Sequence, residues 1–250
     1  MKILGIVGSP RKGGNTDTLI DRALEGAAGR KADVEKLYLR DYNISPCQGG
    51  FTCEVAKSCA IPDDMQRVYA KLREAAGVIV GVPVYMSQIA APLLNFLDRC
   101  RPLISYIDTL GFPGLSPAEE KAVREAKTCL QLWKGRPYSE LPSPEEKIMD
   151  TAINSYVAKN HSHPTATRRL GPGKKGAIII SYGQHVENRY PEVIGLLTNN
   201  LKNFWGLEIV EVIGASGVVK KGDVQTREDL LTRAFQAGHR LADGRSGAGL

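Results

Sequence analysis

The stretch Ile3-Leu4-Gly5-Ile6-Val7-Gly8-Ser9-Pro10-Arg11-Lys12-Gly13-Gly14-Asn15-Thr16 decides how the rest of the chain is interpreted. Its apolar first part predicts a buried strand, and a loop rich in glycine and hydroxyl groups follows. Asn15 or Thr16 can cap a helix whose apolar residues recur at helical spacing, at Leu19, Ile20, Ala23 and Leu24. The first amides of such a helix lack partners within the helix, and the helix dipole favours negative charge there. The stretch therefore predicts an anion site that holds a phosphate.

Two common nucleotide-binding motifs do not match this loop. A Walker loop places Gly-Lys-Ser/Thr at the start of the helix, where this chain has Gly13-Gly14-Asn15-Thr16, and Gly5-Ile6-Val7-Gly8 is not the dinucleotide fingerprint GxGxxG. An ordinary strand-to-helix turn is the remaining alternative. The side chains of Ser9, Asn15 and Thr16 can add hydrogen bonds and Arg11 adds positive charge. This combination at a helix start favours the phosphate site.

The composition is that of a globular protein. The 250 residues are 42% hydrophobic and 24% charged, which are ordinary values, and they suffice for a single α/β domain over residues 1–250 that carries an insertion. No apolar run approaches the length of a membrane span, and the N-terminus predicts a strand instead of a signal peptide. We therefore expect a cytoplasmic protein with no membrane partner. The net charge of +6 suits anionic cofactors, and no basic and aromatic motif supports binding of nucleic acid.

Five short apolar segments predict strands, and helical patterns separate them. The strands are expected at residues 3–7, 34–39, 77–82, 177–181 and 207–213, and the later helices at 62–76, 89–100, 190–205 and 226–243, the last with Thr226 and Asp229 in capping-box positions. This alternation predicts a doubly wound parallel sheet. Such sheets bind ligands beyond the carboxyl ends of the strands, where the strand order reverses. Segments 8–16 and 83–87 both follow strands directly, so both are predicted at that edge.

Two segments resemble the NAD(P)H-dependent FMN reductases of flavodoxin-like fold. The sequence GSPRKGGNT at residues 8–16 is similar to the phosphate loop of that family. Residues 80–87, VGVPVYMS, and residues 94–99, LNFLDR, are similar to the segment of the family that begins with PVY. The resemblance covers residues 1–100 well and the C-terminal third loosely. It implies a flavodoxin-like, five-stranded parallel sheet in the order 2-1-3-4-5, with a helical insertion before the fourth strand.

The same resemblance implies that the chain binds FMN and uses NAD(P)H as its electron donor. The implied phosphate ligands are Ser9, Pro10, Arg11, Asn15 and Thr16. The implied ring contacts are Pro83, Val84, Tyr85, Met86 and Ser87 on one side of the flavin, and Tyr182 and Gly183 on the other.

Flavin chemistry needs no dedicated acid–base pair, so the sequence nominates only weak catalytic candidates. Tyr85 can stack on or flank the ring, and the alternative is a packed aromatic residue of a loop. His185 is a candidate proton donor by position alone, and a histidine near a strand end is more often a surface residue that forms hydrogen bonds.

Three cysteines follow the second predicted strand at equal spacing: Cys47, Cys53 and Cys59. They resemble the motif of the iron–sulfur flavoproteins, a branch whose four cysteines bind a [4Fe–4S] cluster. Gly50 stands at the second position of that motif here, and four thiolates are the usual requirement. The cysteines can be a relic with free thiols, can hold a cluster with one other ligand, or can form a zinc or redox-disulfide site. An odd total of five cysteines argues against structural disulfides.

Residues 103–175 exceed what a flavodoxin-like domain needs. Two capping boxes, Ser116-Pro117-Ala118-Glu119 and Ser143-Pro144-Glu145-Glu146, each precede an amphipathic pattern and predict a pair of helices, followed by a basic loop over residues 161–175. We expect the insertion to be rooted at the end of the sheet opposite its own phosphate loop. Its apolar faces can cover the domain, form a subunit interface or close over a flavin, more easily a partner's than its own. Residues 244–250 predict a flexible tail.

These features predict an FMN-dependent oxidoreductase that passes electrons from NAD(P)H to a flavin, a quinone or another small acceptor. Proteins of this family are commonly dimers or tetramers, so we expect a homodimer or homotetramer. One alternative is an iron–sulfur flavoprotein or flavodoxin-like electron carrier with a protein partner such as ferredoxin. Another is a dedicated FMN-dependent dehydrogenase or reductase of one biosynthetic metabolite.

Overall fold

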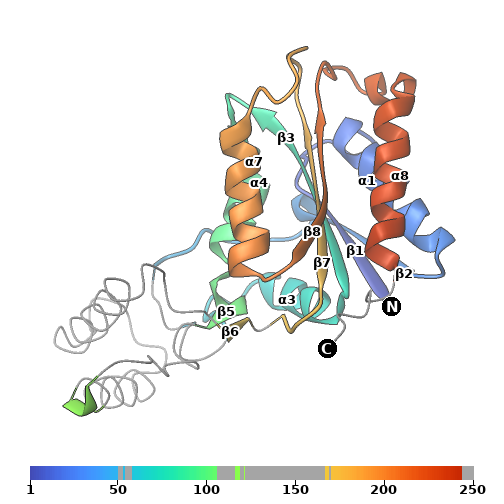
Figure 1. Cartoon of the computed structure of the whole chain (residues 1–250). Coiled ribbons are helices and arrows are strands. Elements are labelled where there is room, and N and C mark those ends of the chain that lie inside the picture. The colour runs from blue at the N-terminus through green and yellow to red at the C-terminus, as the bar shows by residue number, and fades with distance from the viewer. Residues whose placement is uncertain are drawn as a thin grey trace.

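The computed structural model of the chain describes residues 1–49, 53, 58–105, 116–118, 121, 167, 168 and 170–243. They form a central β-sheet between two layers of helices (Figure 1). The sheet contains five parallel strands in the order β2-β1-β3-β7-β8, which confirms the predicted order 2-1-3-4-5. The strands are β1 (Lys2–Val7), β2 (Asp33–Tyr38), β3 (Gly77–Tyr85), β7 (Lys175–Ser181) and β8 (Glu208–Ala215).

Helices on both faces of the sheet bury two separate apolar clusters. One face carries α1 (Asn15–Gly29) and α8 (Glu228–Ala242), and the other carries α3 (Met65–Glu74), α4 (Ala91–Asp98) and α7 (Pro191–Thr198) (Figure 1). Because β1, β3 and β7 are buried on both sides, they consist of nearly continuous apolar residues, as central parallel strands do.

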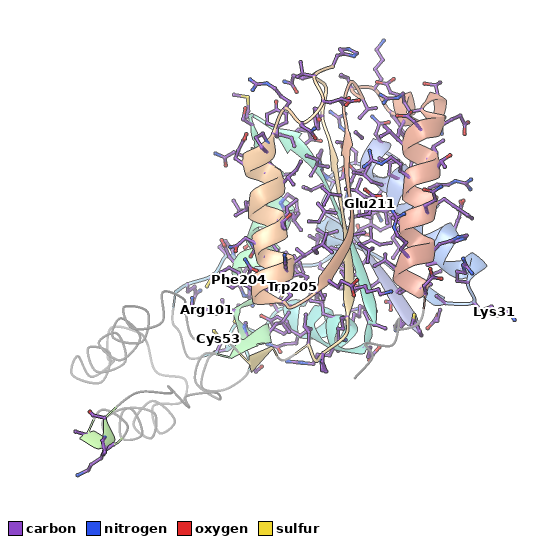
Figure 2. The ribbon with its side chains drawn as sticks, in the orientation of Figure 1. Lys31, Cys53, Arg101, Phe204, Trp205 and Glu211 are labelled. Atoms are coloured by element: carbon purple, nitrogen blue, oxygen red, sulfur yellow. The ribbon has the colours of Figure 1, made fainter. Side chains whose placement is uncertain are left out.

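The helix after β7 ends differently from the prediction. The expected single helix over residues 190–205 is α7 followed by a π-helical segment, η4 (Asn199–Phe204). Trp205 comes directly after it (Figure 2). Its side chain is buried, and its ring lies edge-on to Phe96 at a centroid distance of 5.8 Å. The π-helical turn is wider than an α-helical turn, and it directly precedes the buried indole ring of Trp205.

Four helices differ from the prediction in their first residue or in the residue that caps them. Gly14 is the N-cap of α1, and neither Asn15 nor Thr16 caps it. The predicted capping box of α8 is wrong, because Asp229 pairs with Arg227 and the Thr226 hydroxyl donates to a carbonyl of the preceding turn, η5 (Asp223–Thr226). The helix expected from residue 89 begins at Ala91, because residues 88 and 89 form β4 (Gln88–Ile89) beside β3. The helix expected from residue 62 begins at Met65.

Lys174 and Lys175, at the entry to β7, cap helices on opposite faces of the sheet. The Lys174 ammonium donates to the carbonyl of Arg73 at 2.7 Å, at the end of α3. The Lys175 ammonium donates to the carbonyls of Arg240 and Asp243, both at 3.0 Å, at the end of α8. Successive residues of an extended chain point to opposite faces, and the last carbonyls of a helix lack partners and carry partial negative charge. The two lysines therefore connect β7 to the C-terminal ends of α3 on one face and of α8 on the other.

The two ends of the insertion meet in a short antiparallel pair, β5 (Ile104–Ser105) with β6 (Thr167–Arg168). This pair follows the 3₁₀ turn η2 (Arg101–Leu103) and lies at the end of the sheet where β1 begins (Figure 1). The predicted helical pair, apart from residues 116–118 and 121, and the predicted tail at residues 244–250 lie outside the described residues and stay predictions. Of the predicted basic loop over residues 161–175, positions 161–166 and 169 also lie outside them, whereas residues 167 and 168 form β6 and β7 begins at Lys175. In the part of the chain that the structure describes, no helix is both long enough and apolar enough to cross a bilayer.

Two glycines allow α1 and α8 to pack in backbone contact. A Cβ atom on Gly238 would lie 1.8 Å from the Ala23 carbonyl oxygen, and one on Gly26 would lie 2.0 Å from the Phe235 carbonyl oxygen. Since both contacts are with backbone atoms, no side-chain rotation can relieve them. Interiors this tightly packed do not tolerate added volume well.

We predict that Gly238→Ala lowers the free energy of unfolding by about 2 kcal/mol or more, because the cost of separating the helices exceeds the helix propensity that alanine gains. Gly195→Ala is the matched control, since Gly195 lies in α7 and no described atom lies within 4 Å of its added Cβ. The control should gain up to about 1 kcal/mol. Urea denaturation measures both values, and equal stability of the two variants would contradict the close contact.

Candidate cofactor site

The loops after β1, β3, β7 and β8 reach the same edge of the sheet and enclose a cavity of about 200 Å³. Nine of the twelve residues that the sequence predicted as cofactor contacts line it: Ser9, Arg11, Asn15, Thr16, Pro83, Val84, Tyr85, Tyr182 and Gly183. The other lining residues are Gly14, Ser181, Val218, Val219 and Lys221. Segments that are far apart in the sequence therefore form one site at the carboxyl edge of the sheet.

Hydrogen bonds hold the β1–α1 loop in place at the mouth of this cavity. The Gly8 amide donates to the Gly81 carbonyl at 2.7 Å and fixes the loop against β3. The Ser9 hydroxyl accepts the Arg11 amide at 3.1 Å, and the buried Asp17 carboxylate accepts the Gly13 amide at 2.6 Å. These contacts aim the first turn of α1 at the cavity, where its unpaired amides favour an anion.

Asn15 and Thr16 use their side chains for structure. The Asn15 carboxamide donates to the Lys220 carbonyl at 2.9 Å and accepts the Val224 amide at 3.3 Å, so it joins the β1–α1 loop to the loop after β8. The Thr16 and Ser181 hydroxyls lie 2.7 Å apart and are buried. Asn15 also lines the cavity, so its predicted contact with phosphate stays a prediction beside its observed part in linking the two loops.

Pro10, Met86 and Ser87 do not line the cavity. The Pro10 carbonyl accepts a hydrogen bond from Arg40 beside it. Met86 and Ser87 form the two-residue turn between β3 and β4, with positive φ of 49° and 62°, the conformation of a type I′ hairpin turn. The Met86 side chain is 96% exposed and Tyr85 is 40% exposed, so this hairpin forms a rim of the cavity that faces solvent.

The two candidates after β7 occupy different positions. Tyr182 is buried and packs edge-on against Tyr190 at a centroid distance of 5.2 Å, and its hydroxyl has no hydrogen-bond partner among the described residues. His185 is exposed and does not line the cavity. Its ring lies over Gly217, where an added Cβ would come within 2.7 Å of Nδ1. His185 is therefore an exposed residue shortly after β7 that does not line the cavity, and its part as a proton donor stays a prediction.

Sequence reasoning missed the contribution of the loop after β8. Val218, Val219 and Lys221 line the cavity, and none belongs to a motif that the sequence analysis used. The signal was present in the topology, because a fifth parallel strand must end at the same edge as the first and third.

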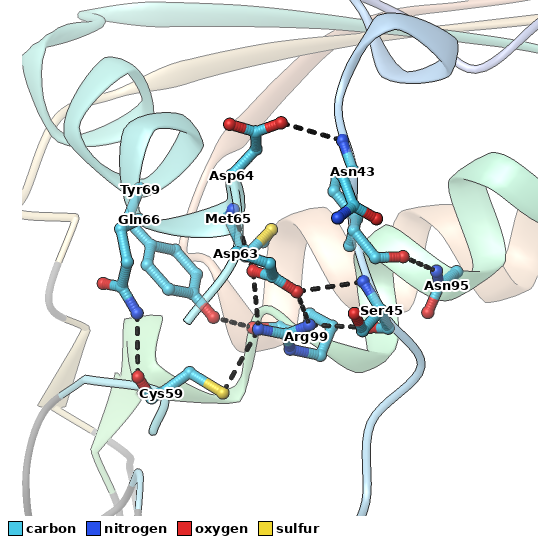
Figure 3. A network of polar contacts seen from close by, with 11 residues as sticks. Asn43, Ser45, Cys59, Asp63, Asp64, Met65, Gln66, Tyr69, Asn95 and Arg99 are labelled. Carbon is cyan, nitrogen blue, oxygen red and sulfur yellow. Dashed lines mark hydrogen bonds and ion pairs between the residues drawn. The ribbon is translucent and has the colours of Figure 1, made fainter. Parts of the chain in front are cut away.

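We call the segment after β2 that carries Cys47, Cys53 and Cys59 the cysteine loop. A buried ion pair between Arg99 and Asp63 anchors it (Figure 3). The Arg99 guanidinium donates to the two Asp63 carboxylate oxygens at 2.7 and 3.1 Å, to the Ser45 carbonyl at 2.6 Å and to the Cys59 sulfur at 3.3 Å. Burial opposes the charge on Asp63, but hydrogen bonds from Arg99 and from the amides of Ser45 and Met65 outweigh it and hold the pKa of Asp63 below its ordinary value.

The described part of this loop does not assemble a ligand set for an iron–sulfur cluster. Cys47 is exposed, Cys59 accepts a hydrogen bond from Arg99, and Cys53 lies toward the end of the sheet where the insertion emerges (Figure 2). Among the described residues no group of three or more histidine, cysteine or acidic side chains is placed to hold a metal ion. Gly50, which stands where the motif has its second cysteine, lies outside the described residues. An iron–sulfur site formed by Cys47, Cys53 and Cys59 therefore stays a prediction.

The chemistry of the cavity fits FMN. At one end, the first amides of α1, the Ser9 hydroxyl and the cations Arg11 and Lys221 suit a phosphate. Toward the hairpin the lining becomes apolar, with Val84 and the half-exposed ring of Tyr85. A ligand with a phosphate at one end and a flat, largely apolar ring at the other matches this gradient.

We predict that Asp63→Asn lowers the free energy of unfolding by about 3 kcal/mol or more near neutral pH, because Arg99 loses its charged partner inside the protein. Since the pKa of Asp63 is lowered by folding, its contribution is complete above about pH 4 and is lost as the pH falls further. The difference between parent and variant should therefore shrink in acid, as denaturation at a series of pH values would show. The control Asp229→Asn removes an exposed carboxylate paired with Arg227 and should cost at most about 1 kcal/mol. A parent–variant difference that is independent of pH would contradict the assignment.

Comparison with known proteins agrees with the fold and the loop motifs. Residues 1–121 match the model of the NADPH-dependent FMN reductase family. An iron–sulfur flavoprotein of Methanocaldococcus jannaschii is 41% identical over 103 residues, which cover 41% of this chain and 53% of that protein. A putative NAD(P)H-dependent FMN-containing oxidoreductase of Bacillus subtilis is 32% identical over 105 residues, 40% of this chain and 51% of that protein. The chain thus spans about half the length of the curated relatives it matches.

Solved structures share the fold at low sequence identity. The NAD(P)H:quinone oxidoreductase of Methanothermobacter marburgensis superposes with a TM-score of 0.58 at 15% identity, over 96% of this chain and 98% of that one. An FMN-dependent NADH-azoreductase of Bacillus anthracis gives a TM-score of 0.57 at 14% identity, over 97% and 100%. The flavodoxin-like fold is therefore established, and the predicted resemblance of this chain to the NAD(P)H-dependent FMN reductases, including the iron–sulfur flavoproteins, is confirmed.

Proposed function

We propose that this protein is an FMN-dependent oxidoreductase that takes hydride from NAD(P)H and passes electrons to a flavin, a quinone or another small acceptor. The observation that carries the proposal is that residues of the β1–α1 loop and of the segment at the end of β3 line one and the same cavity. The family match over residues 1–121 and the names of the relatives support the same chemistry.

The residues divide the work of holding the cofactor. The first turn of α1 and Arg11 bind the phosphate, and Ser9 shapes the turn between them. The Pro83 carbonyl accepts the Ala90 amide at 3.2 Å, so the β3–β4 hairpin is a fixed wall for the ring. FMN, when bound, would supply the redox chemistry between donor and acceptor, and the protein supplies its position and surroundings.

The exposed rim of the cavity supports a small, diffusible second substrate. Tyr85 and Val219 line the cavity and are exposed, and Met86 is exposed beside Tyr85 on the hairpin that forms the rim. Flat aromatic molecules such as a nicotinamide, a quinone or a second flavin suit this surface. We further propose a homodimer or homotetramer, as the resemblance implies, located in the cytoplasm.

A second candidate is an iron–sulfur flavoprotein that exchanges electrons with a protein such as ferredoxin. The observation in its favour is the 41% identity to a protein of that name. The three cysteines that the sequence offers fall short of the usual four thiolates. Iron and acid-labile sulfide measured on anaerobically purified protein separate the candidates, because about four irons per chain would favour the carrier.

We predict that the protein binds FMN, that NADPH bleaches the bound flavin rapidly under anaerobic conditions, and that a quinone restores its colour. Stopped-flow absorbance measures both steps. Rapid reduction by ferredoxin together with slow reduction by NADPH would contradict the reductase and favour the carrier. Failure to bind FMN at all would overturn both candidates.

The phosphate assignment has its own test. Arg11→Met should weaken FMN binding roughly tenfold or more, since a charged hydrogen bond contributes about 1.5–3 kcal/mol, and should leave riboflavin binding unchanged. Arg22→Met is the control, because Arg22 lies in α1 outside the cavity lining and pairs with Glu25. Flavin fluorescence titration gives the affinities, and an unchanged affinity of Arg11→Met for FMN would exclude the assignment.

A further inference from the structure

The loop after β8 is docked on the phosphate loop by several independent contacts. The Asn15 carboxamide holds the Lys220 carbonyl and the Val224 amide, and the Arg11 guanidinium lies 3.5 Å from the Val219 carbonyl. Within the loop, the Asp223 carboxylate accepts the amides of Val219 and Lys220 at 2.8 and 2.6 Å. The residue between these anchors, Lys221, is therefore presented to the cavity by a rigid support.

The side chain of Lys221 lies directly over the turn of the phosphate loop. A Cβ atom on Gly13 would come within 2.9 Å of the Lys221 ammonium nitrogen. Gly13 itself has φ of +68°, a conformation that glycine adopts without strain. The absence of a side chain at Gly13 thus leaves room for the ammonium beside the first turn of α1.

The cations around this loop differ in their partners. Lys12 pairs with Asp41 at 2.5 Å, and Lys36 pairs with Asp17 at 2.9 Å. Among the described residues, neither Arg11 nor Lys221 has a carboxylate partner, and these two are the lysine or arginine residues that line the cavity. Two uncompensated positive charges therefore face the same space.

We propose that Lys221 is a second cationic ligand for the cofactor phosphate, brought from the C-terminal part of the chain to complete the site formed by the N-terminal loop. A phosphate monoester carries close to two negative charges at pH 7. Arg11 and Lys221 match that charge, and the α1 amides supply the remaining hydrogen bonds. The inference rests on the proposed function, because it concerns the phosphate of FMN.

Asn15 takes a supporting part in this arrangement. Its carboxamide touches the residues on both sides of Lys221 in the loop, at positions 220 and 224. Asn15 is thus a positioning residue for Lys221, and the phosphate is bound by groups that this side chain holds in place.

The test compares Lys221→Met with Lys220→Met, a neighbouring lysine whose side chain does not line the cavity. Affinities for FMN and for riboflavin, which lacks the phosphate, are measured by flavin fluorescence. Lys221→Met should lose roughly tenfold or more in FMN affinity and none in riboflavin affinity, and the loss should shrink at high salt. Lys221→Arg should retain most of the affinity, and Lys220→Met should behave as the parent.

Several results would overturn the inference. They are an unchanged FMN affinity in Lys221→Met, an equal loss in Lys220→Met, and an equal loss of riboflavin affinity, which would show a change of loop structure instead of charge. In each of these cases the parent still binds FMN and the proposed function stands. A parent that binds neither flavin would overturn the proposed function and this inference with it.

Discussion

The pairing of β1 with β2 along one side and with β3 along the other is the constraint on which the site depends. The strand order reverses at β1, so the chain leaving β1 turns to one face of the sheet and the chain leaving β3 turns to the other. Two loops that separate in this way leave a crevice between them. The Gly8–Gly81 hydrogen bond fixes its floor, and the loops after β7 and β8 close its sides.

Tight packing of α1 against α8 on one face of the sheet positions the C-terminal part of the chain relative to the crevice. α1 and α8 lie in backbone contact at Gly26 and Gly238, so the positions of the first and last helices are tied together. The loop between β8 and α8 is consequently held above the start of α1, where Asn15 can reach it. Residues more than two hundred positions apart in the sequence therefore share one small cavity.

A second polar centre stabilises the opposite face of the sheet. Arg99 follows α4, and its buried guanidinium joins that helix to the cysteine loop and to Asp63 at the start of α3. Removing charges from water is costly, and such a pair is tolerated only when hydrogen bonds satisfy it. Here the hydrogen bonds are supplied by the backbone of the cysteine loop and by Cys59. Removing one partner of the pair would leave the other charge buried and uncompensated.

The sequence by itself determined the class of the fold and most of the cavity. Apolar segments of strand length in alternation with helical patterns are local properties, and the rule that ligands bind at the carboxyl edge of parallel strands converts them into a site. Tertiary structure alone decided what each polar side chain does there. The Asn15 side chain joins two loops. His185 packs against Gly217 outside the cavity, and Lys221, which no sequence motif indicated, lines the cavity. Hydrogen-bond partners are set by distances between loops that the sequence does not encode locally, so residue type and spacing can nominate a donor but cannot say which acceptor it meets.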